Sequence, residues 1–385
     1  MGQTLPPAFA AGSALLTAHV ACDADDPVAD LRAALGAEEL SLIYLFVSNT
    51  ADFDHVVRRA DECFGDTPVV CCTTAGEISA EGYTEGEIVA VALPSRLFLA
   101  DTMLIEPLDE IDPQTLIGDV IRARAKLTHD ARDMAHEFAF LTVDGLSRKE
   151  DELMSALAPG LGPMQLFGGS AGDGEDFADT YVSYGGKTYQ NAAVLSLVRT
   201  RCPVKVFSLA HLTPTDTRMV VTRADPSRRV VHEINAEPAA REYARILGMV
   251  PEQLDTFTYA AHPVVVRIGG AHHVRAIQRI EDSDDLVFFS AIDEGLVLTL
   301  AEPEDLADHL QRELKKLADA GPLDTIFACD CLLRRIEAEQ DQQTSKISKI
   351  LKENRVVGFA TYGEQIDAKH VNHTMTGVAI YLPES

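Results

Sequence analysis

Histidine and arginine residues in the last third of the chain have the chemistry most suited to ligand binding. A neutral imidazole is a common metal ligand, and a guanidinium can pair with a carboxylate. In the segment HVNHT, His370 and His373 are three positions apart, so a strand would direct them to opposite faces and only one could face a pocket. We rank His370 first, with His373 and His262 behind it, and regard Arg267 and Arg275 as partners for a ligand carboxylate. The plainer alternatives are hydrogen-bonded structural histidines and arginines on a solvated strand face.

A short phrase containing threonine, glycine and glutamate occurs twice in the chain. Residues 69–78 read VVCCTTAGEI, and residues 356–365 read VVGFATYGEQ. Glycine permits a tight turn, and a neighbouring hydroxyl or carboxylate can accept the backbone N–H bonds that lock it. The phrase therefore predicts turn architecture at the end of a strand. The alternative is that the two turns face each other across a pseudo-symmetric cleft, where Glu77 or Glu364 holds a ligand.

A third, looser copy of the phrase lies in the glycine-rich segment MQLFGGSAGDG, residues 164–174. The loop has no lysine or threonine to reach a phosphate or a metal, so it is not a P-loop. We expect its glycines to let two layers approach closely, and Asp173 to cap the turn. A pocket built from the three turns would be lined by Thr74, Gly76, Glu77, Gly168, Gly169, Thr361, Gly363, Glu364 and Asn372.

The cysteines offer a competing chemistry. Seven cysteines, an odd number in clumped positions, do not form a disulfide framework and indicate reduced thiols. Cys329 and Cys331 alternate along a predicted strand, so they point to opposite faces and cannot easily bind one metal together. Buried core cysteines are the first interpretation, and a thiol-dependent enzyme with Cys329 or Cys331 as nucleophile and a C-terminal histidine as base is the alternative. Because the chain carries no nucleophile elbow, zincin motif or Rossmann glycine pattern, we expect no enzyme activity.

The elements that position these residues read as strand, helix, strand, Thr-x-Gly-Glu turn, strand in both full copies. The helix of the first copy has an amphipathic stripe formed by Phe53, Val56, Val57, Ala60 and Phe64. Short apolar runs separated by helices predict an α/β fold of the α+β type, with mixed β-sheets flanked by helices. We expect a lead-in over residues 1–34, a first portion over 35–228 and a second portion over 229–385.

The charge balance limits the classes of partner. A net charge of -27 at pH 7 repels phosphate backbones and anionic headgroups, so we expect no nucleic-acid or membrane binding. No apolar run approaches the roughly 20 residues that span a bilayer. The opening segment has no lysine or arginine before Arg32 and therefore does not resemble a secretory signal. These features predict a cytoplasmic protein.

The chain resembles the FIST family of two-part sensory modules. The resemblance rests on CCTTAGEI at 71–78, LFGGSAGD at 166–173, NAEPAAREY at 235–243, FACDCLLRR at 327–335, GFATYGEQ at 358–365 and HVNHTMTGVAI at 370–380. These segments occur in family order and span roughly residues 35 to 382. The resemblance implies a FIST-N and a FIST-C portion that bind a small ligand and signal to a partner.

The stand-alone length and the C-terminal segment are similar to the NosP branch of this family. That resemblance implies haem b as cofactor, nitric oxide as the sensed ligand, and His370 as the candidate ligand to the haem iron. It also implies a separate histidine kinase, diguanylate cyclase or phosphodiesterase as partner, and it is compatible with a homodimer. The alternative within the family is a sensor that binds an amino acid or another small metabolite without haem.

Overall fold

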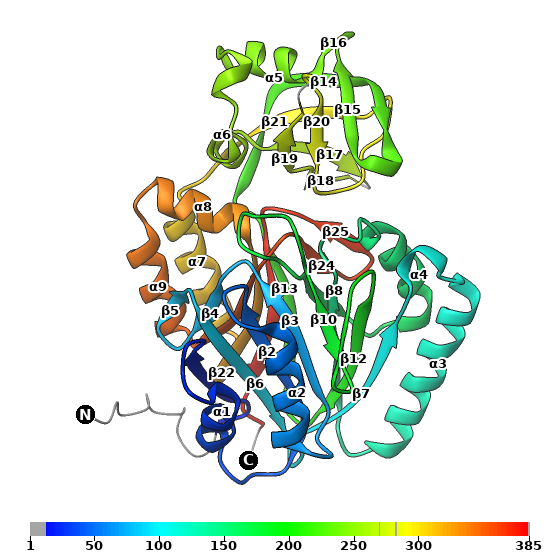
Figure 1. Cartoon of the computed structure of the whole chain (residues 1–385), viewed down its shortest axis with the longest axis vertical. Coiled ribbons are helices and arrows are strands. Elements are labelled where there is room, and N and C mark those ends of the chain that lie inside the picture. Colours follow the sequence, from blue (N-terminus) through cyan, green and yellow to red (C-terminus); the bar gives the residue numbers. More distant parts are fainter. Residues whose placement is uncertain (1–12, 269, 282, 384–385) are drawn as a thin grey trace.

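The computed structural model of the chain describes residues 13–268, 270–281 and 283–383. Over these residues the chain forms a large core and a smaller lobe that lies against one end of it (Figure 1). The core consists of three units that follow one order of elements, namely strand, helix, strand, helix, strand, hairpin and strand, except that the third unit has two consecutive helices at the second helical position. The lobe is an insertion between the first strand and the first helix of the third unit.

The elements of the core follow the chain unit by unit. The first unit contains β1 (Leu16–Ala21), α1 (Pro27–Leu35), β2 (Leu40–Ser48), α2 (Phe53–Phe64), β3 (Val69–Thr74), β4 (Glu77–Ser79), β5 (Gly82–Thr84) and β6 (Glu87–Pro94). The second contains β7 (Phe98–Ile105), α3 (Pro113–Asp130), β8 (His136–Val143), α4 (Glu150–Leu161), β9 (Leu166–Ser170), β10 (Val182–Tyr184), β11 (Lys187–Tyr189) and β12 (Ala193–Thr200). The third contains β13 (Val204–Leu209), α7 (Leu306–Ala318), β22 (Leu323–Cys331), α8 (Leu332–Gln340), α9 (Thr344–Glu353), β23 (Val356–Thr361), β24 (Glu364–Ile366), β25 (Lys369–Val371) and β26 (Met375–Tyr381).

The three units exchange their hairpins in a cycle. In each unit one parallel strand pair, β2–β3, β8–β9 or β22–β23, lies inside an otherwise antiparallel sheet. The hairpin β4–β5 of the first unit adds to β23 of the third, β10–β11 of the second adds to β3 of the first, and β24–β25 of the third adds to β9 of the second. Each six-stranded sheet of the core therefore contains strands from two units.

The inner faces of the three sheets meet in one aromatic core. Phe46 stacks on Phe359 with ring centroids 4.3 Å apart, and Phe140 packs against Phe327 at 4.6 Å. These contacts join the first unit to the third and the second unit to the third, and the aromatic side chains supply much of the buried apolar area. The units are therefore held together by side-chain packing as well as by strand exchange.

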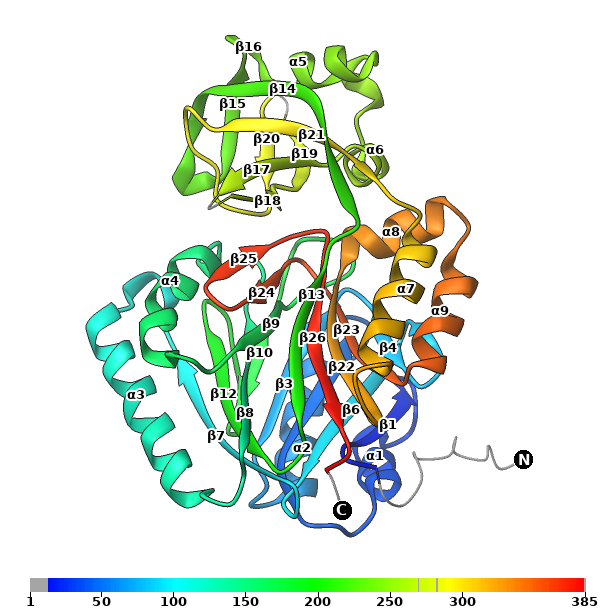
Figure 2. The same ribbon diagram turned by 180° about the vertical axis from the view of Figure 1, so that it is seen from behind.

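Helices cover the outer face of each sheet (Figures 1 and 2). The helix α2 begins at the N-cap Asp52, whose side chain accepts a hydrogen bond from the backbone N–H of His55. The predicted stripe on α2 is buried against its sheet, as the amphipathic pattern requires. In the same way α3 and α4 cover the second sheet, and α7 and α9 cover the third.

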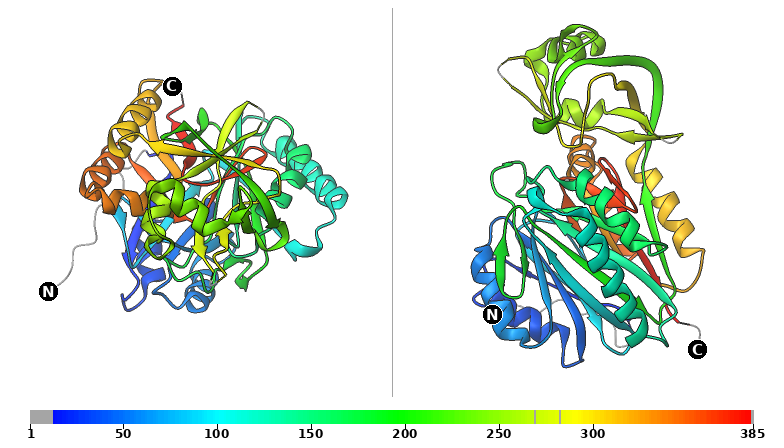
Figure 3. Two further views of the ribbon diagram at one scale, coloured as in Figure 1. Left: turned by 90° about the horizontal axis from the view of Figure 1, so that it is seen from above. Right: turned by 90° about the vertical axis from the view of Figure 1, so that its right-hand side faces the viewer.

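The lobe consists of residues between β13 and α7. It contains β14 (Leu212–Asp225), β15 (Val230–Ile234), β16 (Glu237–Pro238), α5 (Ala239–Leu247), α6 (Thr256–Ala261), β17 (Val264–Ile268), β18 (Ala271–Val274), β19 (Ile277–Ile280), β20 (Leu286–Phe288) and β21 (Val297–Pro303). Its strands form one eight-stranded sheet with a hydrophobic cluster of its own. The lobe is joined to the core through two neighbouring antiparallel strands, β14 and β21, and stands above one end of the core (Figure 3).

The fold prediction is confirmed, because mixed sheets flanked by helices are present and the repeated phrase marks equivalent turns. The third copy of the phrase, which we expected to be a looser echo of the other two, belongs to a complete unit, the second along the chain. The expected boundary after residue 228 falls at the turn between β14 and β15, within the lobe.

Candidate functional site

The carboxylates of the repeated phrase lock the turns in which they lie. Glu77 is fully buried, and its Oε1 accepts a hydrogen bond of 2.5 Å from Thr74 Oγ1. Glu364 is also fully buried and accepts hydrogen bonds of 2.6 Å from Thr361 Oγ1 and from Thr374 Oγ1. Both glutamates are therefore part of the internal packing of the strand exchange.

The third copy places Asp173 at the position of the two glutamates. Its carboxylate accepts hydrogen bonds from the backbone N–H groups of Phe177 and Ala178 and from the hydroxyl of Tyr362. The segment Ser-Ala-Gly-Asp at 170–173 thus matches the Thr-x-Gly-Glu phrase, with serine in place of threonine and aspartate in place of glutamate. This similarity in sequence indicates that the chain contains a third unit equivalent to the other two.

The glycines of these turns are required by close approach. Gly76 has φ +119°, and a Cβ atom there would lie 1.9 Å from Arg335 Nη1. At Gly363 a Cβ atom would lie 2.4 Å from His370 Cε1. Gly168 and Gly169 in β9 are buried where the second sheet meets its neighbours, as expected for a close approach of layers.

Burial of Glu364 makes a prediction for the pH dependence of stability. Burial raises the pKa of Glu364 from its ordinary value of 4.5 to about 8, although hydrogen bonds from Thr361 and Thr374 oppose the shift. Between these two values the native state holds a proton that the unfolded state has lost, so the free energy of unfolding falls as pH rises, by up to ~1.4 kcal/mol per pH unit from this group. The variant Glu364→Gln keeps the side-chain shape without a titrating group and is expected to flatten the profile between about pH 5 and pH 8. Urea unfolding across this range measures the effect.

The matched control for that series is Glu152→Gln, because Glu152 is exposed on α4 and its ion pair is with Lys149 on the surface. Its profile is expected to follow the wild type. A Glu364→Gln profile with the wild-type slope would contradict the assignment of this carboxyl as the source of the pH dependence.

The junction between the lobe and the core brings His370, Gln365 and Asn372 together. His370 is 3% exposed, and its Nδ1 lies 3.2 Å from Gln365 Nε2. Its Nε2 is buried and has no hydrogen-bond partner among the described residues, and Gln365 Oε1 is in the same state. Asn372 bonds to Ser290 of the lobe and donates to the backbone oxygen of Tyr362 at 3.2 Å. A buried imidazole with a free nitrogen is available for a ligand, and burial lowers the pKa of His370.

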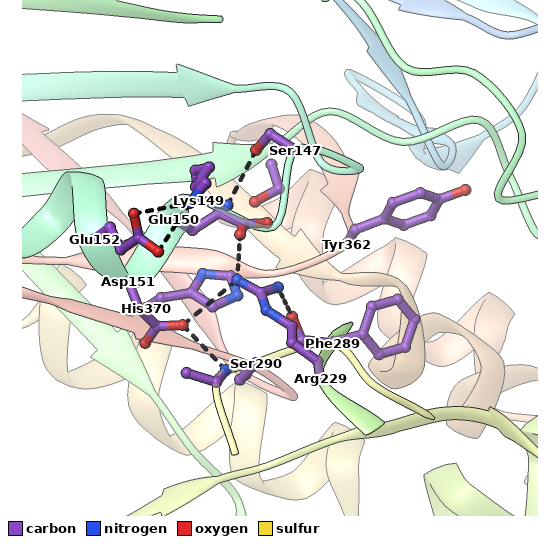
Figure 4. A network of polar contacts seen from close by, with 12 residues as sticks. Ser147, Lys149, Glu150, Asp151, Glu152, Arg229, Phe289, Ser290, Tyr362 and His370 are labelled. Carbon is purple, nitrogen blue, oxygen red and sulfur yellow. Dashed lines mark hydrogen bonds and ion pairs between the residues drawn. The ribbon is translucent and has the colours of Figure 1, made fainter. Parts of the chain in front are cut away.

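Charged side chains from both parts of the chain gather beside His370 (Figure 4). Arg229, which directly precedes β15, donates to Glu150 Oε2 at 2.6 Å and lies 3.6 Å from Asp151 Oδ2. Asp151 also accepts a hydrogen bond from the backbone N–H of Ala291, which follows β20. The sequence reasoning missed Arg229, Glu150 and Asp151, because they become neighbours only when the lobe meets the start of α4.

Arg275 is the least compensated charge of the junction. It is 7% exposed, its Nη1 donates to the backbone oxygen of Val274 at 3.2 Å, and its Nε is buried without a partner. Within the described part of the chain no carboxylate lies within ion-pair distance of Arg275. Burial lowers its pKa, and the charge of Asp151 opposes that shift from a greater distance. A buried guanidinium that no carboxylate contacts is costly, so the position is suited to an anionic ligand group.

The other predicted ligand residues lie elsewhere. Arg267 is exposed on β17, paired in register with His272 of β18. His262 follows α6, and its backbone oxygen accepts a hydrogen bond of 2.6 Å from Tyr243 Oη. Neither residue belongs to the junction network shown in Figure 4.

His373 belongs to a separate buried cluster. Its Nε2 lies 2.9 Å from Glu337 Oε2, and the same carboxylate contacts His211 Nε2 at 2.9 Å. The three ligand atoms lie within 4.8 Å of one another, which is compatible in size with a metal site. Arg334 argues against this use, because its Nη1 lies 3.0 Å from His211 Nδ1. An arginine can only donate, so the neutral imidazole carries its proton on Nε2, where a metal would have to bind.

The two candidate cysteines occupy opposite faces of β22, as predicted. Cys329 packs in the aromatic core and Cys331 in the cluster beneath the lobe. Both are buried, and burial raises the pKa of both thiols well above the ordinary value. Since the thiolate is the reactive form, this environment disfavours thiol catalysis.

A wide surface pocket of about 930 Å³ lies beside α2 and the hairpin β10–β11, and its lining does not include His370, Gln365 or Arg275. Its wall includes Asp52, Asp54, Asp173, Asp176 and Asp179. We place the candidate ligand site at the junction because buried polar atoms without partners gather there, on His370, Gln365 and Arg275.

Comparison with known proteins agrees with this architecture. The FIST N domain of the family models matches residues 41–237, and the FIST C domain matches residues 239–367. A search of curated proteins finds no significant match. Among the described residues no helix is long and apolar enough to cross a membrane. FIST domains are in general small-ligand sensor domains of signalling proteins and are sensory rather than catalytic, and this chain belongs to the FIST family.

Proposed function

We propose that the protein binds a small anionic ligand at the junction of lobe and core and passes the signal to a separate signalling enzyme. The observation that carries the proposal is Arg275, a buried guanidinium without an ion pair in the described structure. It lies close enough to His370 for its charge to lower the pKa of that imidazole. A ligand carboxylate would compensate Arg275, and contacts with both parts of the chain would report occupancy through the position of the lobe.

Haem b is the first candidate ligand, with nitric oxide as the sensed signal. The donor set fits, because His370 offers a free Nε2 and Arg275 can pair with a propionate. Bound haem would supply the iron at which nitric oxide binds. An imidazole that binds iron through Nε2 carries its proton on Nδ1 and needs an acceptor there. Rotation of the Gln365 amide by half a turn brings its unpaired Oε1 toward Nδ1 and supplies that acceptor.

The test of this candidate is an absorption spectrum of the full chain with one equivalent of haemin, taken before and after reduction and addition of nitric oxide. We expect a stoichiometric Soret band that shifts with nitric oxide, and a loss of at least about tenfold in haem affinity in His370→Ala, because this variant removes the imidazole that would bind the iron. His262→Ala is the matched control and is expected to bind like the wild type. A wild-type chain without a Soret band would end the haem proposal.

A small metabolite such as an amino acid is the second candidate. The junction holds acidic and basic groups together, so Arg275 could bind a carboxylate while Asp151, 29% exposed in its side chain, could bind an ammonium group. Thermal unfolding with each amino acid tests it, because a ligand that binds the native state raises the midpoint by an amount that grows with the logarithm of its concentration relative to Kd. The partner that we propose for either ligand is a histidine kinase or an enzyme of cyclic-di-GMP turnover, and co-purification with the sensor checks the contact.

A further inference from the structure

The segment His370–His373 connects the candidate ligand site to the base of the lobe. His370 and Asn372 lie at the junction, where Asn372 bonds to Ser290 of the lobe. His373 is the next residue, has a left-handed φ of +56°, and is fully buried. Its imidazole leaves the junction and contacts Glu337 on α8. This short segment, which runs from the end of β25 into the turn that follows it, therefore touches the lobe at Asn372 and the interior of the core at His373.

Glu337 joins this turn to the residue at which the chain enters the lobe. Its carboxylate contacts His211 at 2.9 Å and 3.0 Å, and His211 directly precedes β14. The backbone oxygen of His211 accepts a hydrogen bond of 2.8 Å from Glu304 N, just after β21 ends. His211 thus lies where both connecting strands of the lobe meet the core. Figure 2 shows β14 and β21 running together between the lobe and the core.

The protonation of this network is determined by its neighbours. Burial opposes ionisation of Glu337, but hydrogen bonds from His211 and His373 outweigh it and lower the pKa of the carboxyl to about 2. Burial lowers the pKa of His211 to about 4, so the imidazole is neutral near pH 7 and donates from Nε2. An ionised carboxylate can only accept, so His373 also donates from Nε2. Each contact of Glu337 therefore has one possible direction.

We infer that the His373–Glu337–His211 relay transmits ligand occupancy from the turn 370–373 to the two strands that carry the lobe. The inference rests on the proposed ligand site for its input, while the relay itself is present without ligand. Buried, charge-assisted hydrogen bonds are costly to leave unmade, so a shift of His373 must be followed by Glu337 and His211. Occupancy at His370 would then alter the angle at which β14 and β21 leave the core.

Hydrogen exchange of the full chain without ligand tests the relay. In Glu337→Gln the negative charge is removed and an NH₂ group replaces one of the two carboxylate oxygens, so both histidine contacts lose their charge assistance. We expect exchange to accelerate about tenfold both at 370–376 and at 209–213, which are far apart in sequence. Glu339→Gln on the same helix is the control, because the Glu339 side chain is 46% exposed, and it is expected to leave both segments unchanged.

A second variant keeps the test decisive if Glu337→Gln does not fold. Asparagine tolerates the left-handed backbone of His373, so His373→Asn removes the imidazole with little backbone strain. Faster exchange at 209–213 in this variant is the expected result. Acceleration confined to 370–376 would overturn the inference. Stoichiometric metal in the purified wild type that is lost in Glu337→Gln would overturn it as well, since the cluster would then be a metal site.

The same hydrogen-exchange comparison is repeated with haemin as the ligand. In the wild type we expect haemin to slow exchange at 209–213, whereas Glu337→Gln is expected to bind haemin and show no such protection. If haemin does not bind the wild type, the proposed haem site fails, while the ligand-free comparison still decides whether the relay exists.

Discussion

Replacing residues 214–301 with Asn-Gly is expected to leave a folded core, whereas residues 1–210 expressed alone are expected not to fold. The physical reason is the cyclic hairpin exchange. The fragment 1–210 lacks β22, β23 and β26, so the hairpin β4–β5 loses its partner strand. It also lacks the hairpin β24–β25, which leaves an edge of β9 unpaired. The aromatic core loses Phe327 and Phe359.

The lobe, by contrast, can be removed at its base. Leu212 and Pro303 are paired in register on β14 and β21, so the two strands can be closed by a two-residue hairpin turn. Far-UV circular dichroism and thermal unfolding measure the outcome, with one cooperative transition expected for the shortened chain and none for the fragment. Cooperative unfolding of residues 1–210 would show that the first two units fold without the third and would contradict a need for the exchanged hairpins.

Arg334→Met is expected to destabilise the protein by about 3–5 kcal/mol, because it leaves a buried carboxylate without its cation. Arg334 is fully buried, and its Nε donates to Asp330 Oδ1 at 2.6 Å. The aspartate, also fully buried, accepts a further hydrogen bond from Tyr83 of the exchanged hairpin. The ion pair therefore links α8 and β22 to a strand of the first unit.

A double-mutant cycle separates the pair from its surroundings. The double variant Arg334→Met with Asp330→Asn removes both charges and is expected to be less unstable than the sum of the single variants. Arg312→Met is the control, since Arg312 is half exposed on α7 and its pairs are worth roughly 1 kcal/mol or less. Urea unfolding gives each free energy. Additive effects of the two charge removals would contradict the coupling.

The sensory family and the position of the lobe together bear on how the chain would respond to a ligand. A FIST chain with an inserted lobe has two ways to respond to a ligand, by ordering the junction or by moving the lobe on β14 and β21. The relay through Glu337 favours the second, because it connects the junction to the base of both strands.

Local patterns in the sequence determined the elements and the turns of this protein. Alternation and apolar runs predicted the strands, the stripe from Phe53 to Phe64 predicted α2, and the Thr-x-Gly-Glu phrase marked the strand ends, because these signals act over a few residues. The position of Cys329 and Cys331 on opposite faces followed from the two-residue period of a strand.

Only the tertiary structure decided which hairpin pairs with which sheet and which charges meet at the junction. A hairpin with strands of three residues has too short a sequence pattern to specify the strand with which it pairs. The exchange of β4–β5, β10–β11 and β24–β25 could therefore not be predicted from the sequence. Arg229 and Glu150 are 79 positions apart, and His211 and Glu337 are 126 apart. The low dielectric of the protein interior strengthens such pairs, and that interior forms only when distant segments of the chain pack together.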